Sequence, residues 1–491
     1  MPSSTNEWAK AEKEIVQDQQ LQEKVTNEEF KIWKKTVPLL YDLIHTFALD
    51  HPSTIVEWLP KVENVDDDKV EVQFLLSSNT INAMENSLEL ASITLSSTLI
   101  GHDAISVPAD GVDTSNFKRI TKWKQNSVAN ALKLSPDGST ALSFNGDGII
   151  HGYNLTSDIV VDYKYHKQSG FALEWIKDND NNSERFLSGA NDSQIALWQL
   201  DKPSTPIQLF KSHHGAINDI STSDANIFGS VSDDSTTQIH DLRASSIASG
   251  GVGDYANPAI KVDNKFIQNC IKFHPQINTL YATAGKDNVV SLYDVRNYKQ
   301  PFRKLFGHND AIRQLEWDWS NPSTLVSCGL DSRVIFWNLE NLEEDYSYPD
   351  ANANSSETSK RKNQQANKPD PCLKYVHGGH VGRINDFAIH PKIPHLFASV
   401  GDDRLLEIWK PKTLPVEEEE VDEEQEEEEE QKEEEKEEGQ EQKNAGDEEQ
   451  EKEKTAQEEK EKSPDADAGK SPKDEEDGEE VSSSKDVEMK D

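Results

Sequence analysis

The sequence predicts an all-β protein: a seven-bladed β-propeller with an N-terminal α-helix before it and a disordered acidic C-terminal tail after it. Three observations predict this architecture: a segment that recurs six times, a helical pattern upstream of it, and a change to acidic composition near Glu417. The expected boundaries are 1–38 for the helical segment, 39–411 for the propeller and 416–491 for the tail.

The recurring segment has one fixed internal spacing. Small residues precede an Asp, and an alternating, strand-like run then ends in an aromatic position, a polar residue and an aliphatic residue. The aromatic positions are 45, 42, 53, 44 and 72 residues apart, and a period of about 40–45 residues that ends in a Trp-Asp-like dipeptide is typical of WD40 repeats. Each copy therefore predicts one four-stranded propeller blade. The Asp lies six residues before the aromatic position in every copy, in the pairs Asp147 and Tyr153, Asp192 and Trp198, Asp234 and His240, Asp287 and Tyr293, Asp331 and Trp337, and Asp403 and Trp409.

The repeated Asp residues and Trp198, Trp337 and Trp409 are interpreted as structural positions. An Asp in a tight turn can accept hydrogen bonds from turn amides and from a histidine upstream, and that histidine can reach a Ser or Thr and the Trp. The candidate histidines are His166, His214, His308 and His380. We therefore expect these residues to stabilise the blades and not to catalyse a reaction.

A closed ring needs a seventh blade and a strand that joins the two ends of the chain. Residues 54–95 contain three strand-like runs and predict the first blade. The run LLYDLIHTF, residues 39–47, is predicted to pair with the last blade near Lys410, because an open propeller would leave a strand edge exposed. Upstream, Phe30, Trp33 and Val37 have the spacing of one helix face, and Pro38 predicts that the helix ends at Val37.

Two segments depart from the regular repeat. A long loop in blade six, residues 341–374, accounts for the 72-residue spacing, and a loop of this length is either disordered or functional. From Glu417 to Asp491 the chain has 37 acidic and 11 basic residues, which predicts a disordered tail. The tail is interpreted either as a solubilising charge run or as a polyanion that attracts basic partners.

Composition argues against several classes of protein. With 91 acidic and 51 basic residues, the net charge of −40 disfavours direct nucleic-acid binding. The sequence contains no run of about 18 apolar residues that would predict a membrane span. Three cysteines without a CxxC pair predict neither a disulfide framework nor a zinc site. Since the sequence contains no nucleophile elbow, P-loop or HExxH motif, we expect no catalytic residue, metal or cofactor. The expected compartments are the cytoplasm and the nucleus.

Two blocks of sequence resemble one known family. The blocks are EEFKIWKKTVPLLYDLIHTFALDHPSTIVEWLP (28–60) and YVHGGHVGRINDFAIHPKIPHLFASVGDDRLLEIWKP (375–411), and they are similar to the first and last parts of the histone-binding WD40 proteins, the retinoblastoma-binding histone chaperone family. The segments SGFALEW, FLSGANDSQIALW and INDFAIHPKIPHLFAS are similar to the fungal branch that serves as the non-catalytic subunit of type B histone acetyltransferase. The resemblance covers most of residues 25–411.

The resemblance implies a histone-binding groove between the N-terminal helix and the long loop of blade six. An amphipathic helix of histone H4 would lie in it. The residues carried over by position are an apolar floor of Leu39, Leu40, Tyr375, Val376 and Leu405, with Asp370 facing the basic side chains of H4. The implied partners are histones H4 and H3 and an acetyltransferase catalytic subunit. The alternative is that the apolar residues simply pack the helix on the propeller.

The sequence also departs from the family. Some members bind the H3 tail on the flat face of the propeller through carboxylates, and the matching positions here hold Ser127, Ser169, Asn218 and Ala311. We therefore expect weaker or no H3-tail binding there, although Asp310 and Asp402 lie nearby. Two other functions stay open: a small subunit of a chromatin-assembly factor or histone deacetylase complex, and a general WD40 scaffold.

Overall fold

The computed structural model describes residues 21, 24–66, 69–82, 85–96, 117–157, 159–176, 184–243, 257–343 and 369–412. The statements below concern this part of the chain. The tail predicted at 416–491 and the middle of the loop predicted at 341–374 lie outside it. The contacts between residues divide the chain into two units, Met1–Thr413 and Leu414–Asp491. No described helix is both long enough and apolar enough to cross a bilayer.

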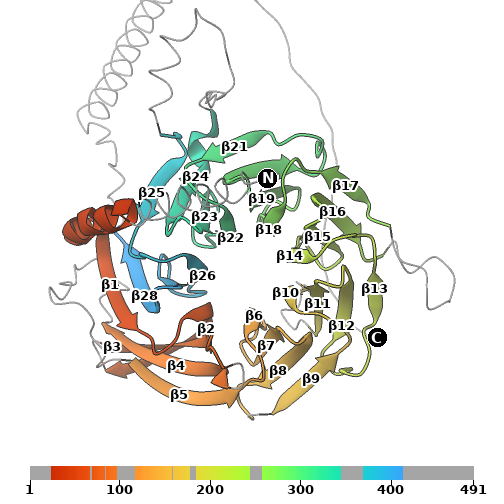
Figure 1. The fold of residues 1–491 in the computed structure, drawn as a ribbon, viewed down its shortest axis with the longest axis horizontal. Coiled ribbons are helices and arrows are strands. Elements are labelled where there is room, and N and C mark those ends of the chain that lie inside the picture. The colour runs from red at the N-terminus through yellow and green to blue at the C-terminus, as the bar shows by residue number, and fades with distance from the viewer. Residues whose placement is uncertain are drawn as a thin grey trace, which may run out of the picture. The chain divides into compact units, whose positions relative to one another are not determined.

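Seven four-stranded antiparallel sheets surround a central axis as the blades of a propeller (Figure 1). This confirms the predicted fold class. Blades one to three consist of β2 (Ser53–Asp66), β3 (Lys69–Ser78), β4 (Ser87–Ser96) and β5 (Phe117–Lys124); β6 (Ala129–Leu134), β7 (Thr140–Asn145), β8 (Ile149–Asn154) and β9 (Val160–Lys164); and β10 (Gly170–Trp175), β11 (Arg185–Ala190), β12 (Ile195–Gln199) and β13 (Gln208–Phe210).

The remaining blades repeat the same order from the axis to the rim. Blades four to six consist of β14 (Ile217–Thr222), β15 (Ile227–Ser232), β16 (Thr236–Asp241) and β17 (Ile260–Asp263); β18 (Gln268–Phe273), β19 (Leu280–Gly285), β20 (Val289–Asp294) and β21 (Arg303–Phe306); and β22 (Ile312–Trp317), β23 (Thr324–Gly329), β24 (Val334–Asn338) and β25 (Leu373–His377), with the 3-10 turn η4 (Leu339–Glu343) after β24. Blade seven consists of β26 (Ile384–Ile389), β27 (Phe397–Gly401), β28 (Leu405–Pro411) and β1 (Tyr41–Ala48).

The N-terminal strand closes the ring as predicted. β1 pairs antiparallel with β28, from Tyr41 opposite Pro411 to Ala48 opposite Leu405. The rim strand of blade seven therefore comes from the opposite end of the propeller sequence, and separating the ends would break this sheet.

The helix extends farther than the sequence predicted. It occupies residues 24–40 and passes through Pro38, whereas the prediction ended it at Val37. Proline removes one amide donor to the preceding turn, but Lys34, whose carbonyl loses that donor, is exposed, so water can hydrate the carbonyl. Val37 is 7% exposed and packs with Tyr41 and Ile44, which offsets the cost of the helical geometry.

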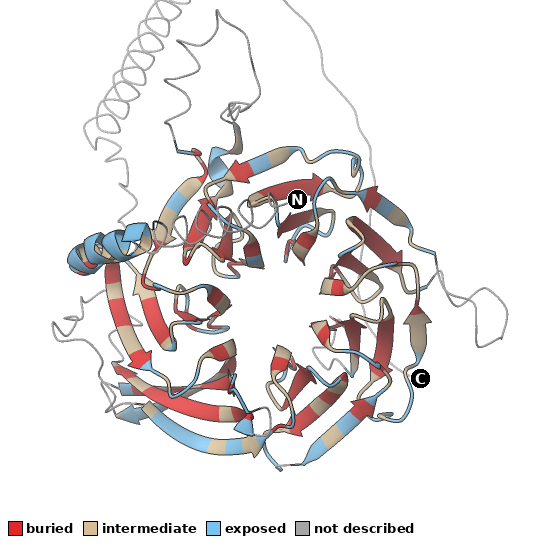
Figure 2. Cartoon of the chain, viewed as in Figure 1, coloured by how far each residue is buried: buried red, intermediate tan, exposed pale blue. Residues whose placement is uncertain are grey.

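The apolar core is divided among the interfaces between neighbouring blades. One cluster, for example, joins Phe144 and Tyr163 of blade two to Trp175, Phe186 and Trp198 of blade three. Burial is highest on the second strand of the blades, as in β7, β23 and β27, whereas the helix and rim strands such as β5 are much more exposed (Figure 2). Since every blade covers the apolar face of the next, no blade has a core of its own.

A hydrogen-bonded network stabilises blades three, six and seven, as predicted. In blade three, Trp198 Nε1 donates to Ser188 Oγ over 2.9 Å, His166 Nε2 lies 2.8 Å from the same oxygen, and His166 Nδ1 lies 3.1 Å from Asp192. The residue after Asp192 has a φ of 63°, and the Asp carboxylate accepts the amide of Gln194, which stabilises that turn. The equivalent residues in blades six and seven are His308, Ser327, Trp337 and Asp331, and His380, Ser399, Trp409 and Asp403.

Blade four corrects one predicted residue. The ring that contacts Asp234 is that of His213, at 3.0 Å, and not that of His214, which donates only its backbone amide. In blades two and five, Asp147 and Asp287 form no hydrogen bond with a histidine of the described ranges. Asp147 instead accepts the amide of Ile149 at 3.0 Å. The turn is therefore common to the repeats, while the histidine network is not.

Candidate functional site: a groove beside the N-terminal helix

The N-terminal helix is fixed to the propeller by a chain of polar contacts. Trp33 Nε1 donates to the Tyr41 hydroxyl over 2.7 Å, and that hydroxyl lies 2.8 Å from His377 Nδ1. His377 Nε2 lies 3.0 Å from Glu407 Oε2, and the His377 ring stacks on Trp409 with centroids 4.1 Å apart. Burial raises the pKa of Tyr41 and lowers the pKa of His377. The C-terminal half of the helix therefore has a rigid, buried base.

The other half of the helix is held by an ion pair on the surface. Both carboxylate oxygens of Glu29 lie 2.8 Å from Arg333 Nη2. Arg333 follows Ser332, and both residues lie in the turn between β23 and β24, where Ser332 has a φ of 64°. Because the helix is attached near both ends, the surface between it and blade six keeps a defined shape.

A groove of about 360 Å³ lies between the helix and blade six. Its lining combines apolar side chains from the helix with residues of blade six and the segment after β25, and its polar groups include two carboxylates. The lining residues are Thr26, Glu29, Phe30, Ile32, Trp33, Thr36, Leu40, Asp331, Ser332, Arg333, Val376, Gly378 and His380. Such a groove can receive a row of apolar side chains from a ligand, while the two carboxylates of the groove are already paired with Arg333 and His308.

The structure brings only two of the predicted groove residues to this lining, Leu40 and Val376. Leu39 is 72% exposed beside the groove. Tyr375 packs edge-on against Tyr41 and Phe336, with centroids 5.8 and 5.5 Å away, so its ring belongs to the packing under the helix. Leu405 pairs with Ala48, at the end of β1 farthest from the helix junction, and does not line the groove.

Asp370 has a different role from the predicted one. It is 2% exposed, and its carboxylate lies 3.0 Å from Arg303 Nη2 and accepts the backbone amides of Phe306 and Cys372 at 3.0 Å each. A carboxylate with these partners does not face a ligand. The expectation that Asp370 meets basic side chains of H4 is therefore wrong for this structure: Asp370 anchors the end of the long loop to blade five.

Sequence reasoning missed Ile32 and Arg333. Ile32 is 62% exposed although it is a large apolar residue. A signal for it exists, because it lies off the helix face of Phe30, Trp33 and Val37 that packs inward. Arg333 carries no such signal, since its partner Glu29 is 304 residues away in the sequence.

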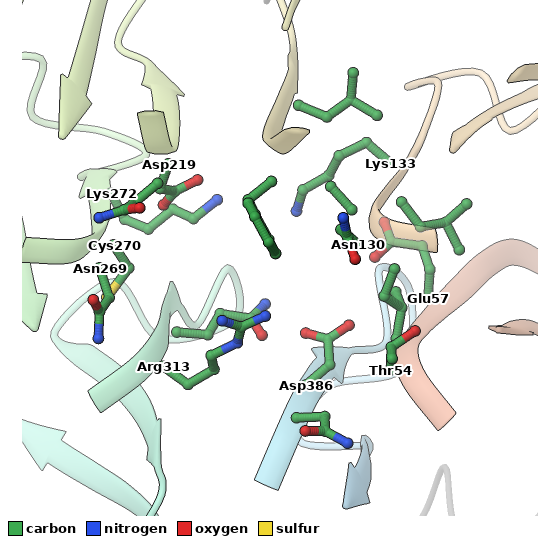
Figure 3. A pocket seen from close by; sticks show the side chains of 18 residues that line it. Thr54, Glu57, Asn130, Lys133, Asp219, Asn269, Cys270, Lys272, Arg313 and Asp386 are labelled. Atoms are coloured by element: carbon green, nitrogen blue, oxygen red, sulfur yellow. The ribbon is translucent and has the colours of Figure 1, made fainter. Parts of the chain in front are cut away.

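The central channel is a second candidate site, and Figure 3 shows its charged lining. Lys272 lies 3.6 Å from both Glu174 and Glu316. Asp386 accepts the amide of Val56 at 3.0 Å, and burial raises its pKa to about 7. The contacts of Lys272 with Glu316 and of Asp386 with Val56 join neighbouring blades, and the contact of Lys272 with Glu174 joins blade five to blade three, so closure of the ring is sufficient to explain them.

On the flat face of the propeller, polar side chains also form hydrogen bonds with other residues of the propeller. Asn218, one of the positions at which we expected weaker H3-tail binding, donates to Asp233 and to the Gln268 carbonyl, each at 3.0 Å. Asp402 accepts a hydrogen bond from Asn385 at 2.9 Å.

Three buried side chains, His377, His380 and Glu407, lie close enough to hold a metal ion. Both histidines already have partners outside the cluster, and His377 Nδ1 lies 2.8 Å from the Tyr41 hydroxyl. His380 already contacts Asp403 through one ring nitrogen at 3.0 Å and Ser399 through the other at 2.9 Å. Since a metal would displace one of these contacts, we assign none to the cluster.

Comparison with known proteins identifies two matching family models. One describes the histone-binding protein RBBP4 or a subunit of the CAF1 complex and matches residues 28–97; the other is the "WD domain, G-beta repeat" and matches residues 299–338. The first match contains most of the helix and the first three strands of blade one, together with the closing strand β1.

The chain is also similar in sequence to yeast proteins named histone acetyltransferase type B subunit 2. The protein of Candida glabrata is 30% identical over 416 residues, which cover 82% of this chain and 92% of that protein. The protein of Eremothecium gossypii is 27% identical and the alignment covers 79% and 86% of the two chains. For Kluyveromyces lactis the identity is 28%, with 78% and 92% covered.

Proposed function

The chain belongs to the histone-binding WD40 family that includes the histone acetyltransferase type B subunit 2 proteins, and on this premise we propose that it is the histone-binding, non-catalytic subunit of a type B histone acetyltransferase. In this role it binds histone H4, together with H3, and presents the H4 tail to a separate catalytic subunit. In this proposal the chain binds newly made histones, and it does so in the cytoplasm and the nucleus.

The observation that carries the proposal is the groove between the helix and blade six. Its apolar residues Ile32, Leu40 and Val376 offer a surface for the apolar side of an amphipathic helix. The chain as a whole has a net charge of −40, which suits a ligand rich in lysine and arginine. A core-histone helix combines these two properties.

The mechanism is tethering. While the groove holds one segment of H4, the flexible tail of the same histone stays close to the catalytic subunit, and its lysines reach a high effective concentration there. This chain then contributes no group to acetyl transfer, and its effect is on the apparent affinity of the catalytic subunit for its substrate.

A pull-down with purified H3–H4 tests the proposal. The wild-type chain should retain H3–H4 at moderate salt, and Leu40→Asp should weaken retention about tenfold, because a charge enters the apolar lining. Ile277→Asp, at a residue 50% exposed outside the groove, is the matched control. Failure of the wild-type chain to retain H3–H4 would contradict the proposal.

A second candidate function is a subunit of a chromatin-assembly factor, because the description of the matching family model also names the CAF1 complex. The chain that co-purifies from cell extract separates the two functions. An acetyltransferase catalytic chain supports the first, and a large assembly-factor subunit supports the second.

A further inference from the structure

The rim strand of blade one differs from the other rim strands in length. β5 has eight residues, whereas β9, β13, β17, β21 and β25 have 5, 3, 4, 4 and 5. Short rim strands limit pairing with other chains. The remaining rim strand, β1, also has eight residues, but it follows directly from the N-terminal helix, which lies beside it (Figure 1).

The outer edge of β5 is open in the described structure. β5 is the last strand of the order β2-β3-β4-β5, and no described strand pairs with its other side. It lies on the outside of the ring, where most of it is exposed (Figure 2). Ile120 is 48% exposed at the middle of the strand. An unpaired edge with an exposed apolar residue is a template for one more strand.

β5 also differs from the rest of the chain in charge, because it is basic. Its sequence FKRITKWK contains four basic residues and no acidic one, in a chain whose net charge is −40. Arg119 pairs with Asp50 and Glu89, and Lys122 pairs with Glu89. Lys118 and Lys124 are exposed and form no ion pair with another described residue. The strand therefore presents positive charge on either side of Ile120.

We propose that β5 is a docking strand for an acidic, extended segment of a partner protein, which adds to blade one as a fifth strand. Backbone hydrogen bonds to the open edge give affinity, carboxylates of the segment meet Lys118 and Lys124, and an apolar residue of the segment covers Ile120. This surface is separate from the groove beside the helix, so it accommodates a second partner while the groove is occupied.

Lysines on an edge strand also prevent pairing with a second copy of the same strand, because like charges would face each other. The lysines therefore disfavour a self-paired dimer but not a partner of opposite charge, and this asymmetry is the reason for choosing an acidic segment as the occupant. A bulge between β4 and β5, where Thr121 pairs with Leu90 and Arg119 with Ala91, bends the edge for any partner alike.

The test measures binding of a fluorescein-labelled peptide in which glutamate and valine alternate. Residues 417–491 carry a large excess of acidic side chains that would compete with the probe. The probe is therefore added to the full chain and to a chain that ends at Thr413, which keeps all seven blades and their closing strand. The double variant Lys118→Glu/Lys124→Glu should weaken binding about tenfold at low salt.

Lys261→Glu, on the rim strand β17, is the matched control and should leave binding within about twofold, because its lysine is exposed on a shorter strand. A second probe carries methyl groups on alternate backbone nitrogens, which removes donors for strand pairing, and it should bind about tenfold more weakly than the first.

Three results would overturn the proposal: equal affinity of the double variant, equal weakening by Lys261→Glu, or equal affinity of the methylated probe. Tighter binding of a single-stranded oligonucleotide to the same lysines would also overturn it, since the site would then be one for nucleic acid. Retention of H3–H4 by the double variant should stay at the wild-type level, which separates this test from that of the proposed function.

Discussion

The polar networks inside the blades and the groove beside the helix place their side chains in opposite environments. In blade three, His166, Ser188 and Trp198 are 7%, 0% and 0% exposed and bond to one another. In the groove, Ile32 is 62% exposed, and Leu39 beside it is 72% exposed. The chain satisfies the first set of residues by itself, whereas it leaves the second set open to a ligand.

The difference separates residues that maintain the fold from residues available for binding. A buried polar group without its partner is costly, so a change in the networks reduces the free energy of unfolding. An exposed apolar residue contributes little to that free energy, so a change at Ile32 should alter binding alone. Asp370 is the instructive case, because position suggested the second role and its contacts show the first.

The largest effect is expected from Trp198→Ala. The indole is fully buried between blades two and three, and its removal leaves a cavity and takes away one of the two hydrogen bonds of the Ser188 hydroxyl. We expect a loss of about 3–5 kcal/mol in the free energy of unfolding, measured by urea denaturation. H3–H4 retention by the remaining folded protein should not change. A loss below about 1 kcal/mol, on the order of a surface substitution, would contradict the claim that the buried networks maintain the fold.

A smaller loss of stability is expected from Asp370→Asn. The substitution removes the charge that Arg303 Nη2 faces in a buried pair, and the expected loss is about 2–4 kcal/mol. Asp310→Asn is the control, because Asp310 is exposed. Thermal unfolding of both variants measures the difference. Should Asp370→Asn weaken histone binding while its melting temperature equals that of the control, the anchoring role assigned to Asp370 would be wrong.

The next effect depends on pH. Burial lowers the pKa of His240 to about 3, while the pKa of an unfolded histidine is about 6.5. Below pH 6.5 the unfolded chain binds a proton that the folded chain excludes, so His240 makes stability fall as pH decreases from about 6.5 toward 3, by up to about 1.4 kcal/mol per pH unit. His240→Phe keeps the stacking on Phe228 and removes this contribution.

Urea denaturation at about pH 7 and pH 5.5 measures the effect of His240→Phe. The variant should lose less stability between the two pH values than the wild-type chain. Equal losses would show that His240 is protonated in the folded chain. Burial also lowers the pKa of His390, to about 4, so part of the pH dependence should remain in the variant.

The sequence predicted the blades well because their information is local. The distance from each Asp to its aromatic position is fixed within one repeat, and this spacing located the networks of Asp192, Asp331 and Asp403. The closing strand was also predictable, since a propeller needs a partner for β28. Choosing His214 in place of His213 was an error of one residue in a His-His pair, which spacing cannot resolve.

The groove was predicted less completely because its residues come from distant parts of the chain. Position in the family indicated Leu40 and Val376 correctly as lining residues. The same reasoning misplaced Asp370 and Leu405, since the orientation of a side chain depends on neighbours that no local pattern contains. Arg303, which binds Asp370, lies in another blade, and Arg333 of blade six lines the groove beside its ion-pair partner Glu29 of the helix.

The most direct test of the account is the affinity of an H4 helix peptide for the Ile32→Asp variant. Ile32 lines the groove and is largely exposed, so the account predicts an affinity about tenfold lower than wild type and an unchanged melting temperature. Fluorescence anisotropy with a labelled peptide, with Ile277→Asp as the control, measures both variants under one condition. Wild-type affinity in Ile32→Asp would contradict the claim that this groove holds the histone.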